Sequence, residues 1–496
     1  MIEAYKEQGW KIEQLTHELN KLKRQIFGVK SERFISDTPQ EQLRISFSQE
    51  EHAVPVPEQR EELTYQRKKP GKKQHPVRQE LPAHLPRKII DIYPEGYDES
   101  MKTLGIETTE VLEYTPGKLH VIRYQRHKCK TNDDQGNARM LIAELPCRAI
   151  DKGMAGPGLL SFVITDKYLD HTPLHRQSQQ FAREQVNLSR STLTGWVGQC
   201  FRLLLPLYES LRVIIRESSY LQVDESGILV LTQDKEQSKV KGCMQIYHAV
   251  NEKLAFFQYT PTKEQANLIE ILKSFKGNLQ VDGNVSYEEL KKEENQKKKY
   301  PDITVSHCMA HARRKFDEAL DNDRSRASYA LTEIQALYEI ERRARDELLD
   351  ANLIVALRKK EAVPILKRLH EWLEREYDNV LPKSKIREAI AYSLKRWAGL
   401  CEYVNAGHLL IDNNQVENLI RPLALGRKNY MFAGSHDGAR GAALYYSFIG
   451  TCKLNNIDAY WWFHDVFIRI QDHPINRIHE LLPTKNFRFL HREDGT

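Results

Sequence analysis

The spacing of apolar residues divides the chain into segments of different periodicity. Near the start, five apolar residues alternate spacings of three and four positions: Ile12, Leu15, Leu19, Leu22 and Ile26. This is a heptad seam, and it predicts a leucine-zipper-like helix over residues 1–35. Dimerisation through a short coiled coil is one interpretation, and an amphipathic helix packed on its own domain is the other.

Residues 36–86 are polar and contain several prolines, so we interpret them as a linker that cannot bury enough apolar area to fold alone. The linker ends in a basic run that includes Lys68, Lys69 and Lys72. A flexible arm that follows a nucleic-acid backbone is one interpretation of this run. A solvated run of charge is the alternative.

Two kinds of pattern follow the linker. Residues 87–150 alternate short apolar and polar runs between Gly and Asn turns, which predicts a small β-rich module. Residues 151–215 have helical spacing, with a break at "VNLS" where Ser189 is suited to cap the next helix. The pair resembles a helix-turn-helix that would expose Arg190, Ser191 and Thr194 to DNA. A purely structural helix pair is the alternative.

The centre of the chain predicts a sheet. Three strand-like runs, "YLQVDESGILVLT", "KGCMQIYHAV" and "KLAFFQYTP", precede the helical run "KEQANLIEILKSF" and a further strand in "GNLQVDGN". This order is that of a ribonuclease H-like α/β sheet, which we place at 216–440. A helical insertion over about 318–405 follows, and a helical segment over 441–496 closes the chain.

Two of these strands run into an aspartate, Asp224 in "LQVDE" and Asp282 in "LQVDG". In the ribonuclease H-like order the first and fourth strands are neighbours, so both carboxylates should emerge together at strand ends. Either aspartate alone could be a turn former. Together they repel each other and invite divalent cations, and oxygen ligands suit Mg²⁺ or Mn²⁺.

A third carboxylate is expected from "IDNNQVENLIRPLALGRKNYMFAGS", residues 411–435. Glu417 lies on a helix that we expect to begin near Asp412 and to be interrupted at Pro422. Asn413, Glu417 and Arg421 share one face at spacings of four. With Arg427 and Lys428, Arg421 would form a phosphate-binding edge beside the acids.

A strand followed by a basic helix, "DITVSHCMAHARRKF", carries His311, Arg313, Arg314 and Lys315. These residues lie where the sheet should turn toward the acids, and they could bind a scissile phosphate. A solvated helix face is the alternative.

Composition limits the remaining choices. The 496 residues are 40% hydrophobic, and Lys and Arg exceed Asp and Glu by 74 − 68 = 6, which permits a nucleic-acid partner without demanding one. The seven cysteines are scattered and show no C-x-x-C spacing, so disulfides are not expected. We find no membrane segment or signal peptide, and we expect a cytoplasmic, nucleoid-associated bacterial protein.

The quoted motifs, together with "DKYLDHTPLHRQSQQFAR", "LSRSTLTGWV", "CMAHARRKF" and "CKLNNIDAYWWFHDVFIRI", resemble the transposases of the insertion-sequence-sixty-six family in the family's order. The resemblance implies a DDE catalytic domain of ribonuclease H-like fold that binds two Mg²⁺ or Mn²⁺ ions. Its two aspartates match Asp224 and Asp282, and its glutamate matches Glu417.

The β-rich module departs from the resemblance. Such transposases carry two C-x-x-C pairs in a zinc-binding module, but here "YPEGY" stands at 93–97 and "CKTN" at 129–132, so that only Cys129 remains. Structural zinc needs four ligands. We therefore expect a degenerate zinc module that folds without zinc, on a small core that includes Tyr93, Tyr97 and Val121.

These expectations combine into a multidomain α+β DNA transposase that cleaves transposon ends and transfers the strand into target DNA. We expect DNA as its partner, a homodimer or larger assembly, and possible accessory proteins of the same element. A catalytically silent DNA-binding protein derived from a transposase is the alternative, and a stand-alone nuclease of the same fold is a weaker one.

Overall fold

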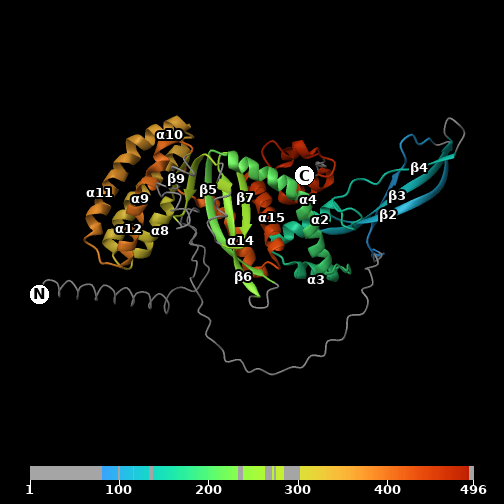
Figure 1. The fold of residues 1–496 in the computed structure, drawn as a ribbon, viewed down its shortest axis with the longest axis horizontal. Coiled ribbons are helices and arrows are strands. Elements are labelled where there is room, and N and C mark those ends of the chain that lie inside the picture. Colours follow the sequence, from blue (N-terminus) through green and yellow to red (C-terminus); the bar gives the residue numbers. More distant parts are fainter. Residues whose placement is uncertain are drawn as a thin grey trace, which may run out of the picture.

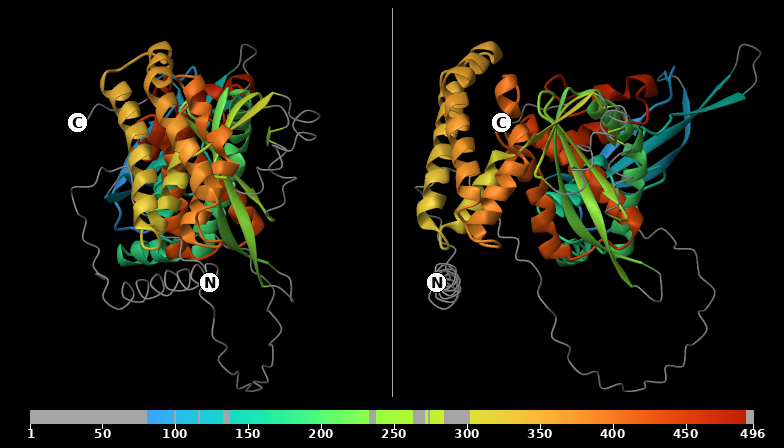
Figure 2. Two further views of the ribbon diagram at one scale, coloured as in Figure 1. Left: turned by 90° about the vertical axis from the view of Figure 1, so that its left-hand side faces the viewer. Right: turned by 60° about the vertical axis from the view of Figure 1, so that its left-hand side comes forward.

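The computed structural model describes residues 81–98, 101–115, 117–132, 138–232, 238–262, 271–272, 275–283 and 302–490. The predicted zipper helix and the linker cations Lys68, Lys69 and Lys72 lie outside these ranges. The described chain forms three parts arranged in a row. A small sheet projects at one end, an α/β body lies in the middle, and a group of helices forms the other end (Figures 1 and 2).

The small sheet, sheet A, comprises β1 (Arg87–Ile92), β2 (Lys102–Thr115), β3 (Lys118–Asn132) and β4 (Ala138–Ile142). The long strand β3 pairs antiparallel with β2 along one edge. On its other edge, β1 pairs parallel with residues 121–126 and β4 pairs antiparallel with residues 128–132. The predicted β-rich segment is therefore a four-stranded mixed sheet.

The "YPEGY" segment packs against β3 through its aromatic rings. Tyr93 stacks on Tyr97 with ring centroids 4.4 Å apart, and on His127 at 4.6 Å. Val121 and Cys129 of the same strand are fully buried. The prediction that Tyr93 and Tyr97 belong to the core was wrong, because Tyr93 is 45% exposed and Tyr97 is only half-buried, so that the rings stack at the surface while Val121 is in the core. Folding without zinc stays a prediction.

A buried carboxylate joins sheet A to the next part of the chain. Glu113 of β2 is 7% exposed and accepts hydrogen bonds from the backbone N–H of Tyr114 (2.8 Å) and of Leu159 (3.0 Å). Leu159 lies in the first turn of α2 (Pro157–Tyr168). A Cβ on Gly156 would lie 2.1 Å from Glu113 Oε2, so this approach requires glycine.

Two helices follow α2, as the sequence predicts. α3 (Leu174–Arg183) and α4 (Arg190–Glu217) are joined by a short turn, and the Ser189 side chain caps α4 by accepting from Thr192 N–H. Arg190, Ser191 and Thr194 are exposed at the start of α4. The opposite face of α4 is buried in the main core through residues at helical spacing: Leu193, Trp196, Cys200, Leu204, Leu207, Leu211 and Ile215.

The central sheet, sheet B, comprises β5 (Tyr220–Leu231), β6 (Lys239–Ala249), β7 (Leu254–Thr260), β8 (Gly277–Val281) and β9 (Ile303–His307), in the order β7-β6-β5-β8-β9. β5, β6 and β7 pair antiparallel, whereas β8 pairs parallel with both β5 and β9. The first and fourth strands are therefore neighbours, as the ribonuclease H-like order requires.

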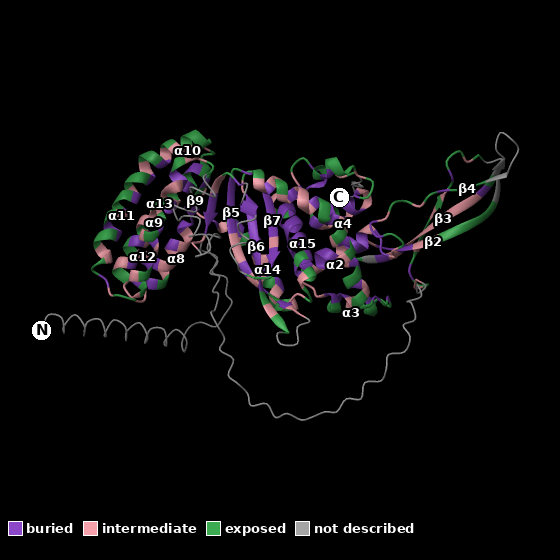
Figure 3. Cartoon of the chain, in the orientation of Figure 1, coloured by how far each residue is buried: buried purple, intermediate pink, exposed green. Residues whose placement is uncertain are grey.

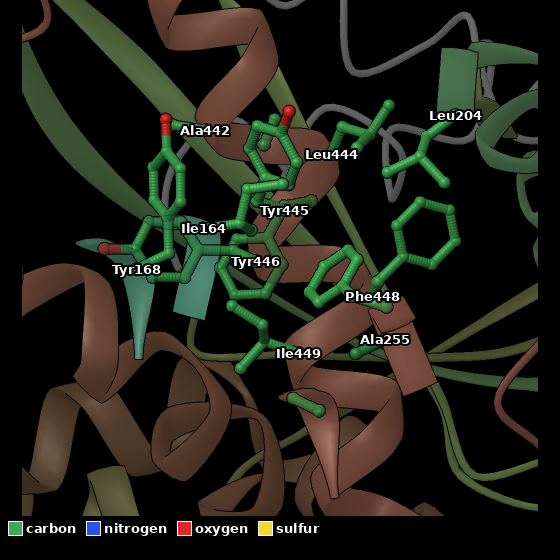
Figure 4. Close-up of a cluster of buried hydrophobic side chains, with 14 of the residues drawn as sticks. Ile164, Tyr168, Leu204, Ala255, Ala442, Leu444, Tyr445, Tyr446, Phe448 and Ile449 are labelled. Atoms are coloured by element: carbon green, nitrogen blue, oxygen red, sulfur yellow. The ribbon is translucent and has the colours of Figure 1, made fainter. Parts of the chain in front are cut away.

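The C-terminal helices cover sheet B. α14 (Asn414–Tyr430) packs on β5, α15 (His436–Leu454) packs on β7, and α16 (Ala459–Arg469) packs on α2. The 3₁₀ helix η4 (Ile475–Leu481) contacts α4. Burial is concentrated on these inner helices and strands (Figure 3), and α15 contributes Tyr445, Tyr446, Phe448 and Ile449 to the packed cluster in Figure 4.

α15 also protects the edge of the sheet. Ser447 Oγ accepts from the backbone N–H of Phe257 at 2.7 Å, and Thr451 Oγ1 accepts from that of Ala255 at 3.1 Å. Both donors belong to the edge strand β7, whose outward N–H groups would otherwise be open to pairing with another strand. The helix runs through residue 441, where we placed the start of a separate C-terminal segment.

The remaining helices form a body with its own core. They are α8 (Met309–Ala319), α9 (Arg324–Asp346), α10 (Ala351–Leu357), the π-helix η2 (Arg358–Ala362), α11 (Val363–Tyr377), α12 (Lys385–Lys395), α13 (Trp397–Cys401) and the 3₁₀ helix η3 (Glu402–Asn405). Their apolar side chains cluster separately from the main core, and Tyr220 of β5 joins this second cluster. None of the helices in the described part of the chain is long and apolar enough to cross a membrane.

Candidate active site

The two predicted aspartates lie at matching positions on neighbouring strands. β5 and β8 pair at Gln222–Gln280, an offset of 280 − 222 = 58 residues, and Asp224 and Asp282 have the same offset, 282 − 224 = 58. Asp282 directly follows β8, as predicted. Asp224 lies inside β5 and not at its end, because β5 stays paired with β6 as far as Leu231. That part of the prediction was wrong.

Glu417 lies in the first turn of α14. The helix begins where predicted, since Asp412 Oδ1 accepts from the backbone N–H of Asn414 at 3.1 Å. The predicted interruption at Pro422 is wrong, because α14 continues to Tyr430 with the proline inside it. Leu419 and Leu423 are buried on either side of Pro422, and this packing holds both halves of the helix in place.

The three acids share one electrostatic environment. Burial, the charge of Asp282 and the charge of Glu417 raise the pKa of Asp224 to about 8, against one hydrogen bond from Glu225 N–H. Burial also raises the pKa of Glu417, with contributions from Asp412 and Asp282 that Arg314 opposes. Carboxylates from β5, from the end of β8 and from α14 therefore act on one another, although 135 residues (417 − 282) separate the last two in sequence.

α8 brings two of the predicted residues to Glu417. His311 Nε2 lies 3.6 Å from Glu417 Oε1, and Arg314 Nη2 lies 3.5 Å from Glu417 Oε2. Burial and the charges of Arg314 and Lys315 lower the pKa of His311 to about 3, so the imidazole is neutral at pH 7. Arg313 instead lies near the half-buried Tyr338 of α9, where its charge opposes the rise that burial causes in the pKa of the phenol.

The other predicted cations differ in their surroundings. Arg421 is half-buried on α14, and Lys428 is exposed. Arg427 donates to the backbone carbonyl of Gly227 in β5, so its guanidinium joins the helix to the sheet. Arg190 is exposed on a separate element, at the start of α4.

The donor set fits a divalent cation. Glu417 Oε1 is buried and has no hydrogen-bond partner among the described residues, and burial together with the nearby carboxylates of Asp282 and Glu417 raises the pKa of Asp224. A bound cation would coordinate the Glu417 oxygen and offset the negative charge of the neighbouring carboxylates. In the described ranges, no three His, Cys, Asp or Glu side chains are already gathered closely enough to hold a metal ion.

Several polar residues near the acids were not predicted from the sequence. Nε2 of His248 in β6 lies 3.1 Å from Oε1 of Gln415 in α14. This contact joins the helix that carries Glu417 to sheet B. Gln222 and Gln280 are buried two positions before the aspartates. The repeated "LQVD" was a visible signal for the glutamines, whereas nothing in the sequence marks His248.

The fold and this site define a multidomain α+β protein with a carboxylate site on its central sheet. The model of the Transposase IS66 family matches residues 152–441, that of the IS66 C-terminal element matches 447–484, and that of Transposase C of IS166 homeodomain matches 14–90. The chain belongs to the IS66 transposase family.

Three relatives come from Sinorhizobium fredii (strain NBRC 101917 / NGR234). The uncharacterized protein y4hP is 32% identical over 83% of this chain and 77% of its own length. The uncharacterized protein y4jD is 30% identical over 81% of each chain, and the uncharacterized protein y4qI is 29% identical over 95% of this chain and 89% of its own. No solved structure matches this chain.

Proposed function

We propose that this protein is a DDE-type DNA transposase whose sheet B has the ribonuclease H-like arrangement. It would hydrolyse a phosphodiester at each end of an insertion sequence and then join the freed 3′-hydroxyl to target DNA. The observation that carries the proposal is geometric: β5 and β8 pair in the register that gives Asp224 and Asp282 matching positions, and α14, which carries Glu417 in its first turn, packs on β5, in a chain of the IS66 transposase family.

The strand order supports this reading of the fold. Three antiparallel strands followed by two parallel ones, with β5 between β6 and β8, bring the strands that lead to Asp224 and Asp282 side by side, which supports a shared site. α14 packs on β5 and carries the third acid. Two Mg²⁺ or Mn²⁺ ions bound by Asp224, Asp282 and Glu417 would supply activation of the attacking oxygen and stabilisation of the leaving one.

The cationic residues near the acids bind and orient the DNA in this proposal. Arg314 balances the charge of Glu417 and is 41% exposed, so it can also contact a phosphate. His311 is neutral and lies against the same carboxylate, where it limits the side chain's movement without adding charge. Arg190 at the start of α4 would contact DNA outside the site. Two DNA ends require at least two copies of the chain, so we propose a homodimer or larger assembly, with accessory proteins of the same element as further partners.

The test is a set of single substitutions that remove one carboxylate each. Asp224→Asn, Asp282→Asn and Glu417→Gln should lower strand cleavage by about 100-fold or more, because each removes a metal ligand. Binding of the same DNA should persist, since none of these side chains contributes much buried apolar area. The substrate is a duplex with the terminal inverted repeat that flanks the gene, in Mg²⁺ buffer.

A matched control is Glu252→Gln, which removes a carboxylate that accepts from the Ser218 hydroxyl just before the start of β5. It should leave cleavage unchanged. Cleavage by Asp224→Asn at the wild-type rate would refute the proposal. Loss of cleavage in all three acid variants together with loss of DNA binding would instead indicate a structural role.

A further inference from the structure

The strands that carry the two aspartates repeat a four-residue pattern. Leu221 to Asp224 on β5 and Leu279 to Asp282 at the end of β8 both read Leu-Gln-Val-Asp. Side chains two positions apart in a strand point to the same face, so Gln222 lies on the same side of β5 as Asp224, and Gln280 has the matching position on β8. Gln222 is 0% exposed and Gln280 is 1% exposed, which is unusual for an amide side chain.

The two glutamines bind each other and the segment that leads into α14. Gln222 Nε2 donates to Gln280 Oε1 at 2.8 Å and to the backbone carbonyl of Asp412 at 2.9 Å. Gln280 Nε2 donates to the backbone carbonyl of Leu410 at 2.9 Å. One buried amide pair therefore connects β5, β8 and the start of the helix that carries Glu417.

Tyr220 completes the network. Its hydroxyl donates to Gln280 Oε1 at 2.6 Å and accepts from the backbone N–H of Leu410 at 3.2 Å. The tyrosine is fully buried, and it belongs to the core of the helical body. The network thus also fixes where the helical body meets the sheet.

The network lies where the backbone pairing of β5 with β8 ends, so it can fix the register of the two strands. Backbone pairing of β5 with β8 spans residues 220–222 and 278–280 and stops there. The amide pair is accordingly at the last paired position before the aspartates. A shift of β8 along β5 by one residue would break the amide pair and turn its side chains to the opposite face.

Stability alone does not call for such a network. A pair of apolar side chains of similar volume would hold two neighbouring strands together at least as well, because buried polar groups bring a desolvation cost. Gln222 Oε1 has no partner within the described ranges, so the amide is held through its nitrogen alone. What the amides add is a fixed geometry, since hydrogen bonds have direction and apolar contacts do not.

We propose that Gln222, Gln280 and Tyr220 are positioning residues that set the two aspartates and Glu417 relative to one another, so that the three carboxylates can share divalent cations. The inference rests on the proposed function, and it assigns roles to residues that touch neither metal nor DNA. Outer residues of this kind typically change metal affinity by about 10- to 100-fold when they are replaced.

The test compares full-length variants in two measurements. The double variant Gln222→Met/Gln280→Met keeps side-chain length and removes both amides. It should melt within a few degrees of wild type without metal, yet bind Mn²⁺ about 10- to 100-fold more weakly by isothermal titration calorimetry. Cleavage of terminal-repeat DNA should need correspondingly more Mg²⁺ and recover in part at high Mg²⁺, which a general loss of structure would not allow.

The matched control is Gln177→Met in α3. Gln177 is also fully buried and also donates through Nε2 to two backbone carbonyls, of Val163 and Thr172, but it lies outside sheet B. Its Mn²⁺ affinity should equal that of wild type. If the melting temperature of the double variant is much lower than that of wild type, the same measurements on Tyr220→Phe test the positioning role, because this substitution removes one hydroxyl and keeps the ring.

The outcomes separate this inference from the proposed function. Wild-type protein that binds no Mn²⁺, or Asp224→Asn protein that cleaves normally, would overturn the proposed function and the positioning role with it. The positioning role alone would be overturned if Asp224→Asn is inactive while the double variant and Tyr220→Phe both bind Mn²⁺ with wild-type affinity. A weakened double variant beside an equally weakened Gln177→Met would also overturn it.

Discussion

The pKa of one buried side chain, Glu113, shows that the cost of burying a charge can exceed the effect of favourable hydrogen bonds. Glu113 lies at the amino end of α2, where the helix dipole and backbone N–H groups favour the charged carboxylate. Burial nevertheless raises its pKa to about 7. Desolvation is the larger effect here, and the joint between sheet A and α2 consequently depends on pH.

Glu113→Gln should remove that dependence. A carboxyl whose pKa is raised from 4.5 to about 7 in the folded state stabilises the fold when protonated, so stability falls as pH rises from about 4.5 to 7 and then stays level. The change is roughly 3 kcal/mol. Melting curves of wild type and variant should converge at low pH, with the variant more stable at pH 8. The exposed Glu107→Gln on the same strand should behave as wild type, and parallel pH profiles for Glu113→Gln and wild type would contradict the prediction.

At the scale of elements, sequence patterns identified strands and helices better than they identified where side chains go. Alternation and helical spacing predicted sheet B, α3, α4 and the Ser189 cap, because these depend on local propensity and on which face is buried. The continuation of β5 past Asp224 depends on pairing with β6, and the continuity of α14 through Pro422 depends on tertiary packing. Neither is encoded locally, and the same holds for the Glu113 joint.

The acids could be proposed from sequence because Asp224 and Asp282 stand in the repeated "LQVD" pattern and Glu417 lies at the start of a recognisable helix, and their role stays a prediction. The linker cations and the zipper helix lie outside the described residues, so their roles stay predictions. The glutamine network required coordinates, since only the paired register of β5 and β8 shows that Gln222 and Gln280 meet.

The cations of α14 should separate into two kinds. Arg421→Ala/Lys428→Ala should weaken DNA binding at every sequence and reduce the salt dependence of log K by up to about two units of slope, because each lost phosphate contact removes about 0.9. Arg427→Ala should leave the slope unchanged and lower the melting temperature, because its guanidinium joins α14 to Gly227 of β5. Binding measured at several salt concentrations, with a melting curve for each variant, distinguishes the two. A decrease in slope of about 0.9 for Arg427→Ala would instead show that this residue contacts a DNA phosphate.

At the scale of the molecule, two separate apolar cores predict two unfolding units. Leu207 lies in the main core and Leu373 in that of the helical body, and both are fully buried. Calorimetry should resolve two unfolding transitions. Leu207→Ala should destabilise only the transition of the main core, and Leu373→Ala only that of the helical body, each by about 2–5 kcal/mol. One transition that both variants shift equally would show that sheet B and the helical body unfold together.

The main core has a further consequence, because it runs without a break from α4 through sheet B to α15. Tyr445 of α15 donates to the carbonyl of Val197 in α4 at 2.6 Å, and Tyr208 of α4 donates to that of Phe257 in β7. The exposed amino end of α4 and Asp224 of β5 therefore belong to elements that share one packed core. If the protein acts as proposed, DNA bound at Arg190 would reach the carboxylates at a fixed distance along the duplex, and the cleavage position would be set by the distance from this contact.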